Sequence, residues 1–219
     1  LLLKHRDKLK AWKPDDEHTR TLSMLNEERR KSVGWRTKLV QRLQALLKGY
    51  FPQAIDLLAG NLSSDMACDF IQKWPTLDAI KRAKPQTVRA FYYAHNSRRG
   101  DRIEENLEKI RMAVALTEDK AIVTASTITA KVIAKQLRLI NAAIEQYDKA
   151  IQALYRKHPD AFIFQSLPGS GKSMGPRLLT AFGTDRERYG QAIDIQTYSG
   201  IAPVTERSGK HEWVHWRWG

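Results

Sequence analysis

A run of apolar residues at heptad spacing constrains the fold of this chain more than any other feature of its sequence. Its members follow alternating steps of four and three: Ile133, Leu137, Ile140, Ile144, Tyr147, Ile151 and Leu154. In the same register, Ala130, Ser126 and Val123 extend the run backwards. Such spacing lines one side of an α-helix with apolar side chains and is typical of coiled coils. It predicts a helix over residues 119–157, unbroken from 123 to 154, whose apolar seam is buried against a partner helix.

Residues 15–48 predict a second long helix. Pro14 and the acidic residues that follow it suit a helix start, where the helix dipole is positive. Leu and Val then recur at steps of three and four until Gly49 ends the pattern. Arg29 and Arg36 interrupt the apolar stripe; by default their stems lie along it while their charged ends reach water, and the alternative is that they face a phosphate backbone. This helix is one possible antiparallel partner for the heptad helix, and a second copy of the protein is the other.

The stretch between the two long helices predicts several short helices separated by Gly and Pro, around residues 53–59, 64–74, 85–95 and 101–114. Basic and aromatic residues are interleaved here, a pattern that suits nucleic acid because cations neutralise phosphates and aromatic faces stack on bases. For Phe91, Tyr92 and Tyr93 we favour burial in a helical core. The cluster of Arg98, Arg99 and Arg102 is equally compatible with contacts to a nucleic-acid backbone and with a solvated surface.

Net charge is the strongest signal of function in the composition. The 219 residues include 37 Lys and Arg against 24 Asp and Glu, which gives a net charge of +13 and a pI near 9.9. Residues 1–50 contain 13 basic and 6 acidic residues, a net +7, so more than half of the excess lies there. Such a balance favours a polyanionic partner, DNA or RNA above an acidic membrane surface. No run of eighteen apolar residues exists, so we expect no membrane-spanning helix.

The chain is expected to be mostly α-helical and to consist of two parts. His158-Pro159-Asp160 ends the heptad helix and separates a helical, coiled-coil region, residues 1–160, from a C-terminal domain, residues 161–219. The single cysteine, Cys68, excludes an internal disulfide and a cysteine-based zinc site, which fits a reducing, cytoplasmic compartment. The first ten residues begin with Leu and carry charges throughout, so we expect them to end a helix that starts further upstream in a longer protein.

The sequence GSGKS at residues 169–173 suggests a nucleotide-binding P-loop, but two observations argue against that interpretation. A P-loop needs a Gly at position 166, where this chain has Ser166. It also follows a strand of a parallel sheet, whereas the pattern upstream of this segment is helical. We therefore expect no nucleotide binding here.

The same segment fits a helix-hairpin-helix better. Leu167-Pro168 precedes Gly169-Ser170-Gly171, whose glycines allow a tight turn, and Gly175 and Leu178-Leu179 follow on the next helix. Such a turn binds a DNA phosphate through backbone N–H groups without reading the sequence. Lys172 adds a positive charge, so we predict DNA contacts at Gly169, Ser170, Gly171 and Lys172. The alternative is a turn between packed helices that binds no ligand.

A second candidate site lies at Ser208-Gly209-Lys210, in what the composition predicts to be a polar, mobile loop. A Ser beside Arg207 and Lys210 has the groups needed to attack a phosphodiester while cations hold its oxygens. Ser199 also precedes a Gly, so the residues alone do not distinguish the two serines. The nearby acidic residues Asp185, Glu187 and Asp194 are interpreted as surface or capping residues.

Several blocks of sequence, taken in order, resemble one family. The blocks LPGSGKSMGPRLLTAFG (167–183) and YSGIAPVTERSGK (198–210), fourteen residues apart, resemble the C-terminal domain of insertion-sequence 110 family transposases, which are relatives of the Piv DNA invertase. Upstream, HRDKLKAWKPDDEHTR, LVQRLQALLKGYFP and WPTLDAIKRAKPQTVRAFYYAHNSRRGDRIE resemble the region between the two catalytic domains of that family. The resemblance covers essentially the whole chain.

The resemblance implies a function and a set of partners. Members have an RNase H-like domain whose acidic tetrad binds Mg²⁺, then a helical coiled-coil insertion, then a transposase domain that supplies a serine nucleophile. That serine matches Ser208, whereas Ser199 matches a position that is commonly Ala. A phosphoserine bond to DNA, a structured non-coding guide RNA and assembly into dimers and tetramers are implied as well. In those assemblies, the acidic and serine parts of one active site come from different subunits.

One departure from the family pattern limits what this chain is expected to do. The acidic tetrad should precede residue 12, and no set of Asp and Glu in residues 1–219 replaces it by pattern. We expect a DNA transposase of the bacterial cytoplasm, associated with the nucleoid, from which the present chain alone is an inactive piece. The alternative from a different class is a non-catalytic, helical nucleic-acid-binding protein. An NTPase ranks third.

Overall fold

The computed structural model describes residues 13–215 of the chain. These residues form ten α-helices, one short 3-10 helix and a two-stranded sheet, so the protein is mostly α-helical, as the sequence predicts. They divide into two compact units. The helical unit consists of residues 24–153, and the terminal unit joins the described residues up to Ser23 to those from Leu154 onward. The predicted helix end in residues 1–10 lies outside the described residues.

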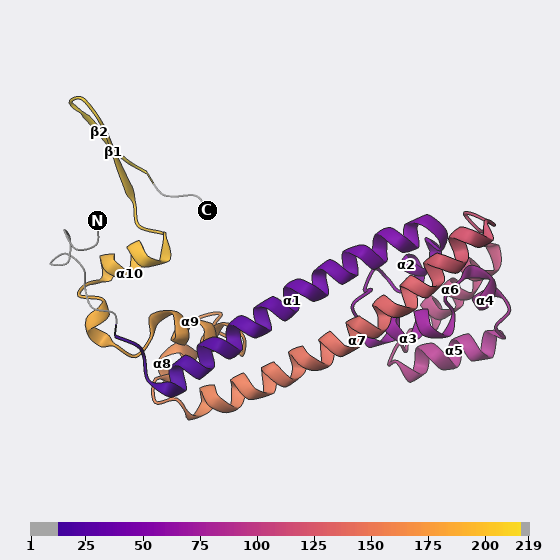
Figure 1. Ribbon diagram of the computed structural model, residues 1–219, viewed down its shortest axis with the longest axis horizontal. Helices are drawn as coiled ribbons and strands as arrows, with labels where there is room; N and C mark the ends of the chain where they lie inside the picture. The colour runs from indigo at the N-terminus through magenta and orange to yellow at the C-terminus, as the bar shows by residue number, and fades with distance from the viewer. Residues whose placement is uncertain (1–12, 216–219) are drawn as a thin grey trace. The chain divides into compact units, whose positions relative to one another are not determined.

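Most of the elements are short (Figure 1). In chain order they are α1 (Glu17–Tyr50), α2 (Gln53–Leu57), α3 (Asp65–Lys73), α4 (Leu77–Lys81), α5 (Pro85–Ala94), α6 (Gly100–Met112), α7 (Lys120–Lys157), α8 (Ala161–Gln165), α9 (Met174–Phe182), a 3-10 helix (Arg186–Arg188), α10 (Ala192–Ser199), β1 (Val204–Ser208) and β2 (His211–His215).

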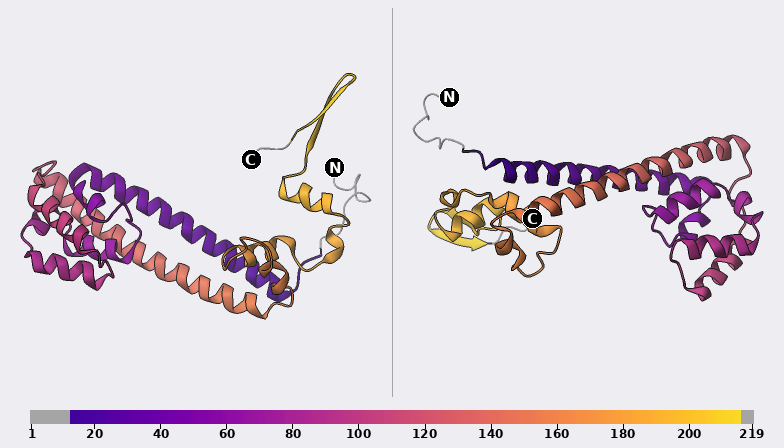
Figure 2. Two further views of the ribbon diagram at one scale, coloured as in Figure 1. Left: turned by 180° about the vertical axis from the view of Figure 1, so that it is seen from behind. Right: turned by 90° about the horizontal axis from the view of Figure 1, so that it is seen from below.

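The two long helices that the apolar periodicity predicts are confirmed as α1 and α7. α7 runs unbroken through the whole heptad pattern. Four of the seven heptad residues between Ile133 and Leu154 are buried and the other three are half-buried. In the helical unit α1 lies antiparallel beside α7 (Figures 1 and 2), and Arg29 Nε is 2.6 Å from Asp148 Oδ1. The ion pair explains one of the two arginines in the stripe of α1, and coiled-coil packing stays a prediction.

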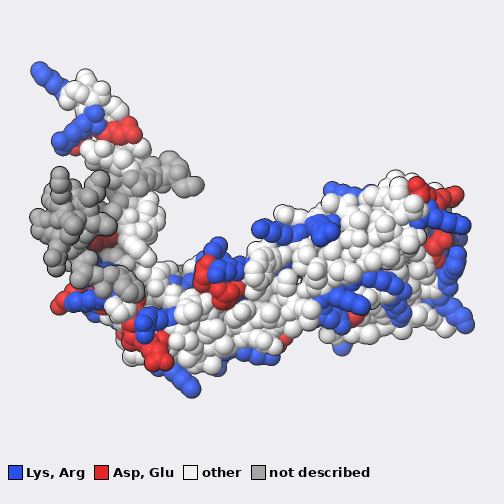
Figure 3. Space-filling view, in the orientation of Figure 1, with Lys and Arg blue, Asp and Glu red and all other residues white. Residues whose placement is uncertain are grey.

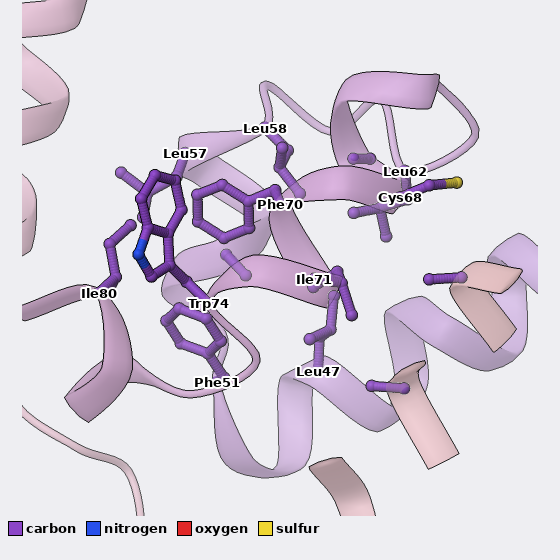
Figure 4. Close-up of a cluster of buried hydrophobic side chains, with 14 of the residues drawn as sticks. Leu47, Phe51, Leu57, Leu58, Leu62, Cys68, Phe70, Ile71, Trp74 and Ile80 are labelled. Carbon is purple, nitrogen blue, oxygen red and sulfur yellow. The ribbon is translucent and has the colours of Figure 1, made fainter. Parts of the chain in front are cut away.

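The short helices α2 to α6 pack around a cluster of apolar side chains in the helical unit. Figure 4 shows Phe51, Phe70 and Trp74 facing one another among leucines and isoleucines. Phe70 and Trp74 both contact Phe91 edge-on, at centroid distances of 6.0 and 5.0 Å. Phe91 and Tyr92 are buried, which confirms the prediction that these aromatics belong to a core, whereas Tyr93 is exposed.

Helix α4 was not expected from the sequence. Its start is fixed by Thr76, whose hydroxyl accepts a hydrogen bond from the backbone N–H of Ala79. Leu77 and Ile80 are its buried residues. Two apolar positions in five residues are too few to establish a helical period, so only the N-cap could have indicated this element.

The terminal unit joins two ends of the described chain. Asp15 accepts hydrogen bonds from the backbone N–H and the hydroxyl of Thr184, at 2.9 and 3.2 Å. The buried hydroxyl of Thr19 lies 3.0 Å from Nε2 of His158. The start of α1 therefore packs with residues from 154 onward, whereas the domain boundary predicted at residue 160 assigns it to the other part.

In the part of the chain that the structure describes, no helix combines the length and the apolar character needed to cross a lipid bilayer.

Candidate nucleic-acid and catalytic site

Ser208 is the last residue of strand β1, so the expectation that it lies in a loop is wrong. β1 and β2 form an antiparallel hairpin in which Ser208 pairs with His211. Gly209 and Lys210 make the two-residue turn, and Gly209 has a φ of +61°, as the first turn position of a type II′ hairpin requires. The backbone twist of such a turn matches the twist of the two strands, so Ser208 and His211, on either side of the turn, can pair. Ser208 is exposed, as the sequence predicts.

The register of the hairpin decides which side chains share a face with Ser208. Side chains alternate along a strand, so the partner His211 lies on that face and Arg207 on the opposite one. Arg207 instead pairs with Glu212 across the ladder, with Nε 2.8 Å from Oε2. Arg207 thus lies in an exposed ion pair on the other face of the hairpin, and its contact with a DNA phosphate stays a prediction. Lys210, in the turn, keeps that role as a prediction.

Other polar groups gather on the Ser208 face. Glu206 accepts a hydrogen bond from the indole N–H of Trp213 at 3.2 Å and lies 3.0 Å from Nε2 of His215. These contacts tie the two strands together at Trp213 and His215, two and four residues beyond His211. They hold in place the register that sets His211 opposite Ser208.

Ser199 occupies a different setting. It ends α10, and its hydroxyl donates to the backbone oxygen of Gln196 at 3.1 Å. Gly200 follows in the left-handed conformation, which is typical of the residue after a helix. Ser199 is thus engaged in ending a helix.

Two of the three acidic residues near these serines do cap elements, as predicted. Asp185 accepts from the N–H of Glu187 at the start of the 3-10 helix. Asp194 takes part in the capping box of α10. Glu187 is exposed.

The GSGKS segment connects α8 to α9, so a helix precedes it in place of the strand that a P-loop follows. Gly169 has a φ of +75°, a conformation that glycine adopts without cost. Gly171 and Lys172 are exposed in this turn. The segment is thus a turn between two helices, and both the helix-hairpin-helix and its DNA contacts stay predictions.

Ser170 has a structural role in that turn, which corrects its predicted contact with DNA. Its side chain is buried and its hydroxyl donates to the backbone oxygen of Phe164, while its backbone N–H donates to Leu167 at 3.1 Å. Neither donor is available to a phosphate in this conformation. Gly169, Gly171 and Lys172 are the remaining candidates.

Arg98, Arg99 and Arg102 belong to the helical unit, before and in the first turn of α6. All three are exposed, and Arg99 pairs with Asp101 at 3.7 Å, a contact between two solvated groups that contributes little to stability. The structure leaves this cluster open to a nucleic-acid backbone.

One polar cluster in the terminal unit was not recognised in the sequence. The Thr19 hydroxyl donates to Asp16 at 2.6 Å, and this hydrogen bond is the main reason why the pKa of Asp16 falls to about 2. Since its proton points to Asp16, Thr19 accepts from Nε2–H of His158, while Nδ1 of His158 accepts from the N–H of Asp160. Burial lowers the pKa of His158 and so favours this neutral form. The cluster is a structural anchor.

Across residues 13–215 no group of three or more His, Cys, Asp or Glu side chains is arranged to hold a metal ion. These residues therefore do not fit the Mg²⁺ that the resemblance implies, and we derive no chemical step through it.

Comparisons with known proteins show which family this chain resembles. A family model described as "Transposase" matches residues 1–52, and one described as "Transposase IS116/IS110/IS902 family" matches residues 161–219. The mini-circle putative transposase for IS117 of Streptomyces coelicolor is 26% identical over 204 residues, which are 91% of this chain and 49% of that protein. The IS900 uncharacterized 42 kDa protein of Mycobacterium paratuberculosis is 25% identical over 94% of this chain and 51% of its own length. No solved structure matches the chain.

These findings place the chain among the transposases. It belongs to the IS110 family, which one of the two matching models names together with IS116 and IS902. The chain spans about half the length of the curated relatives it matches.

Proposed function

We propose that the protein to which this chain belongs is a DNA transposase that exchanges strands through Ser208. The observation that carries the proposal is the position of Ser208: exposed at the end of a hairpin strand, opposite His211, in a segment that the transposase family model matches. In this step Ser208 Oγ attacks a DNA phosphorus and forms an O–P bond, while the bond from phosphorus to a deoxyribose oxygen breaks.

His211 receives the serine proton in this proposal. A serine hydroxyl is a poor nucleophile until a neighbouring base accepts its proton, and a neutral imidazole is the side chain most often used for this. Directly opposed residues of an antiparallel pair have Cβ atoms about 5 Å apart, so the two side chains can reach one another. The departing deoxyribose oxygen takes up a proton, either from His211 or from water.

The remaining parts of the proposal concern binding. Lys172 with Gly169 and Gly171 binds a DNA phosphate, Lys210 holds the phosphate under attack, and Arg98, Arg99 and Arg102 contact a nucleic-acid backbone. The active protein also contains a guide RNA, and an acidic domain outside this chain holds Mg²⁺. The protein assembles as a dimer or tetramer through the coiled coil. It acts in the bacterial cytoplasm, at the nucleoid. The present chain alone is inactive.

The two serines provide the test, in the full-length transposase with its RNA and DNA. Ser208→Ala removes the nucleophile, so it abolishes recombination and the covalent protein–DNA product, but leaves DNA binding nearly intact. Ser199→Ala removes one hydrogen bond at a helix end and leaves recombination within about 2-fold, because such an exposed bond is worth little. Mass spectrometry of the covalent product locates the linked residue.

Strand exchange by the Ser208→Ala protein, or a DNA adduct on another residue, contradicts the assignment. DNA binding with no covalent product from the unsubstituted protein supports the alternative, a non-catalytic nucleic-acid-binding protein, which the net charge of +13 also favours.

A further inference from the structure

A hollow between α1 and α7 in the helical unit has no role in the proposed reaction. It has a volume of about 360 Å³, in the range of small-ligand pockets, and is lined by Trp35, Lys38, Leu39, Gln136, Leu139 and Ile140. Trp35 is 55% exposed and Leu139 72% exposed. Large apolar side chains grouped at a surface mark a place where a ligand or partner binds.

The stretches of α1 and α7 that flank this groove carry positive charge only. α1 has no acidic residue from Arg29 to its end, and α7 has none from its start to residue 144. Lys38 and Arg42 lie one turn apart on α1, and Lys135 lies one turn before Leu139 on α7; all three are exposed. Arg138 pairs with Asp69 of α3. Figure 3 shows Lys and Arg gathered over this unit, with Asp and Glu at only a few places on the same face.

The charges decide between two possible occupants. A second copy of the chain, packed here about a two-fold axis, would bring Lys38, Arg42 and Lys135 close to the same residues of its partner, and like charges oppose such contact. A polyanion with a flat apolar part suits both the cations and the indole ring. Single-stranded nucleic acid has this chemistry, whereas the base faces of a duplex are covered by stacking.

We propose that this groove binds single-stranded DNA. An unpaired base stacks on Trp35 beside Leu139, the Gln136 amide hydrogen-bonds the base edge, and Lys38, Arg42 and Lys135 neutralise the flanking phosphates. DNA is the source because strand exchange separates the two strands of a duplex, so this part of the proposal rests on the proposed function. The groove holds an unpaired strand away from its complement.

The test measures fluorescence anisotropy of labelled oligonucleotides with the 219-residue chain. The probes are a twelve-nucleotide single-stranded DNA of mixed sequence, its duplex and the RNA of the same sequence. Trp35→Ala is expected to weaken single-stranded DNA binding about 10-fold, because stacking on an aromatic ring is lost, and to leave duplex binding unchanged. Trp35→Phe restores most of the affinity. Lys38→Gln lowers the slope of log affinity against log salt by about 1.

Matched variants separate these effects from general ones. Met112→Ala removes another exposed apolar side chain of the same unit, and Lys13→Gln removes one exposed charge of the other unit. Neither is expected to change the preference for single-stranded over duplex DNA. The binding measurement involves no strand exchange, so failure of the nucleophile assignment does not affect this result.

Three outcomes overturn the proposal. The first is an equal loss of single-stranded and duplex binding in Trp35→Ala, or no loss in either. The second is a loss confined to RNA, which assigns the groove to RNA. The third is a dimer in sedimentation that Trp35→Ala dissociates, which assigns the groove to a second copy of the chain.

Discussion

Gly175 shows how closely the α8–α9 turn is packed. A Cβ at this position would lie 2.5 Å from the Tyr155 hydroxyl and 3.2 Å from Ser170 Oγ. Both groups are buried and bonded to backbone oxygens, Tyr155 to Ala161 at 3.1 Å and Ser170 to Phe164. A side chain at Gly175 would therefore displace the contacts that shape the turn.

Gly175→Ala is expected to lower the free energy of unfolding of the terminal unit by about 1–3 kcal/mol, the usual cost of overpacking a core. The matched variant Gly34→Ala lies on the exposed side of α1 with no atom within 4 Å of the new Cβ, and should stabilise by about 0.5–1 kcal/mol. Thermal unfolding followed by circular dichroism measures both. Equal effects of the two substitutions would show that Gly175 is not close-packed.

At this scale, motif and register contribute different information. The resemblance to the family motif suggests Ser208 as the nucleophile without any structure. Whether His211 or Arg207 lies on the same face as Ser208 depends on which residues pair across the strands. A shift of the register by one residue would exchange the two faces of a strand. The sequence presents Arg207 as the neighbour of Ser208, but the hairpin turns it to the other face and replaces it with His211.

The α8–α9 turn has two interpretations, a hairpin that binds DNA and a loop that binds a nucleotide, and they predict different ligands. Lys172→Ala is expected to weaken binding of all DNA sequences to a similar extent, since a phosphate contact carries no sequence information. The slope of log affinity against log salt concentration should become smaller by about 1, as expected for the loss of one phosphate contact. Filter binding with two unrelated duplexes measures this. ATP titration should give no saturable binding, and micromolar ATP affinity that Lys172→Ala abolishes would restore the P-loop interpretation.

Among the elements, long periodic helices were the most predictable. α1 and α7 repeat their apolar pattern over many turns, so the pattern alone predicts them, with no knowledge of which residues they contact. The hairpin was missed because β1 and β2 are five residues each and almost wholly exposed, so no apolar alternation marks them. The turn residues Gly209-Lys210, between two runs that each contain Val, were the available signal.

For the molecule as a whole, the terminal unit could not be predicted from sequence. Its contacts join residues 169 positions apart, as in the hydrogen bond from Thr184 to Asp15, and no local pattern encodes such a pairing. The sequence-based division at residue 160 followed a Pro at a helix end, which marks where an element stops and not which elements pack together.

This unit should respond to mild acid through His158. Burial puts the pKa of His158 in the folded state below its unfolded value of about 6.5. At pH values between these two pKa values the unfolded chain binds more protons than the folded chain. The free energy of unfolding therefore falls as the pH drops through this range. Protonated Nδ1 would also lose its acceptor role toward Asp160. The unfolding temperature should fall between pH 7.5 and 5, and fall less in His158→Gln.

Thr184→Val serves as the matched control, because the Thr184 hydroxyl donates to Asp15 and Asp16 of the same unit, and the pKa of Asp16, about 2, places its titration in strong acid. Its additional loss of stability should therefore change little between pH 7.5 and 5. An unfolding temperature of His158→Gln that changes with pH as much as that of the unsubstituted chain would exclude His158 as the responsible group.

The division of the terminal unit between two distant stretches of chain has a consequence for synthesis on the ribosome. Residues 24–153 form a contiguous unit and can fold as soon as α7 has emerged. Asp15 and Thr19 are translated before the helical unit, but they gain their partners Thr184 and His158 only after that unit has been translated. The helical unit is thus complete first, and the residues just before it remain without their final contacts until the residues from 154 onward have emerged.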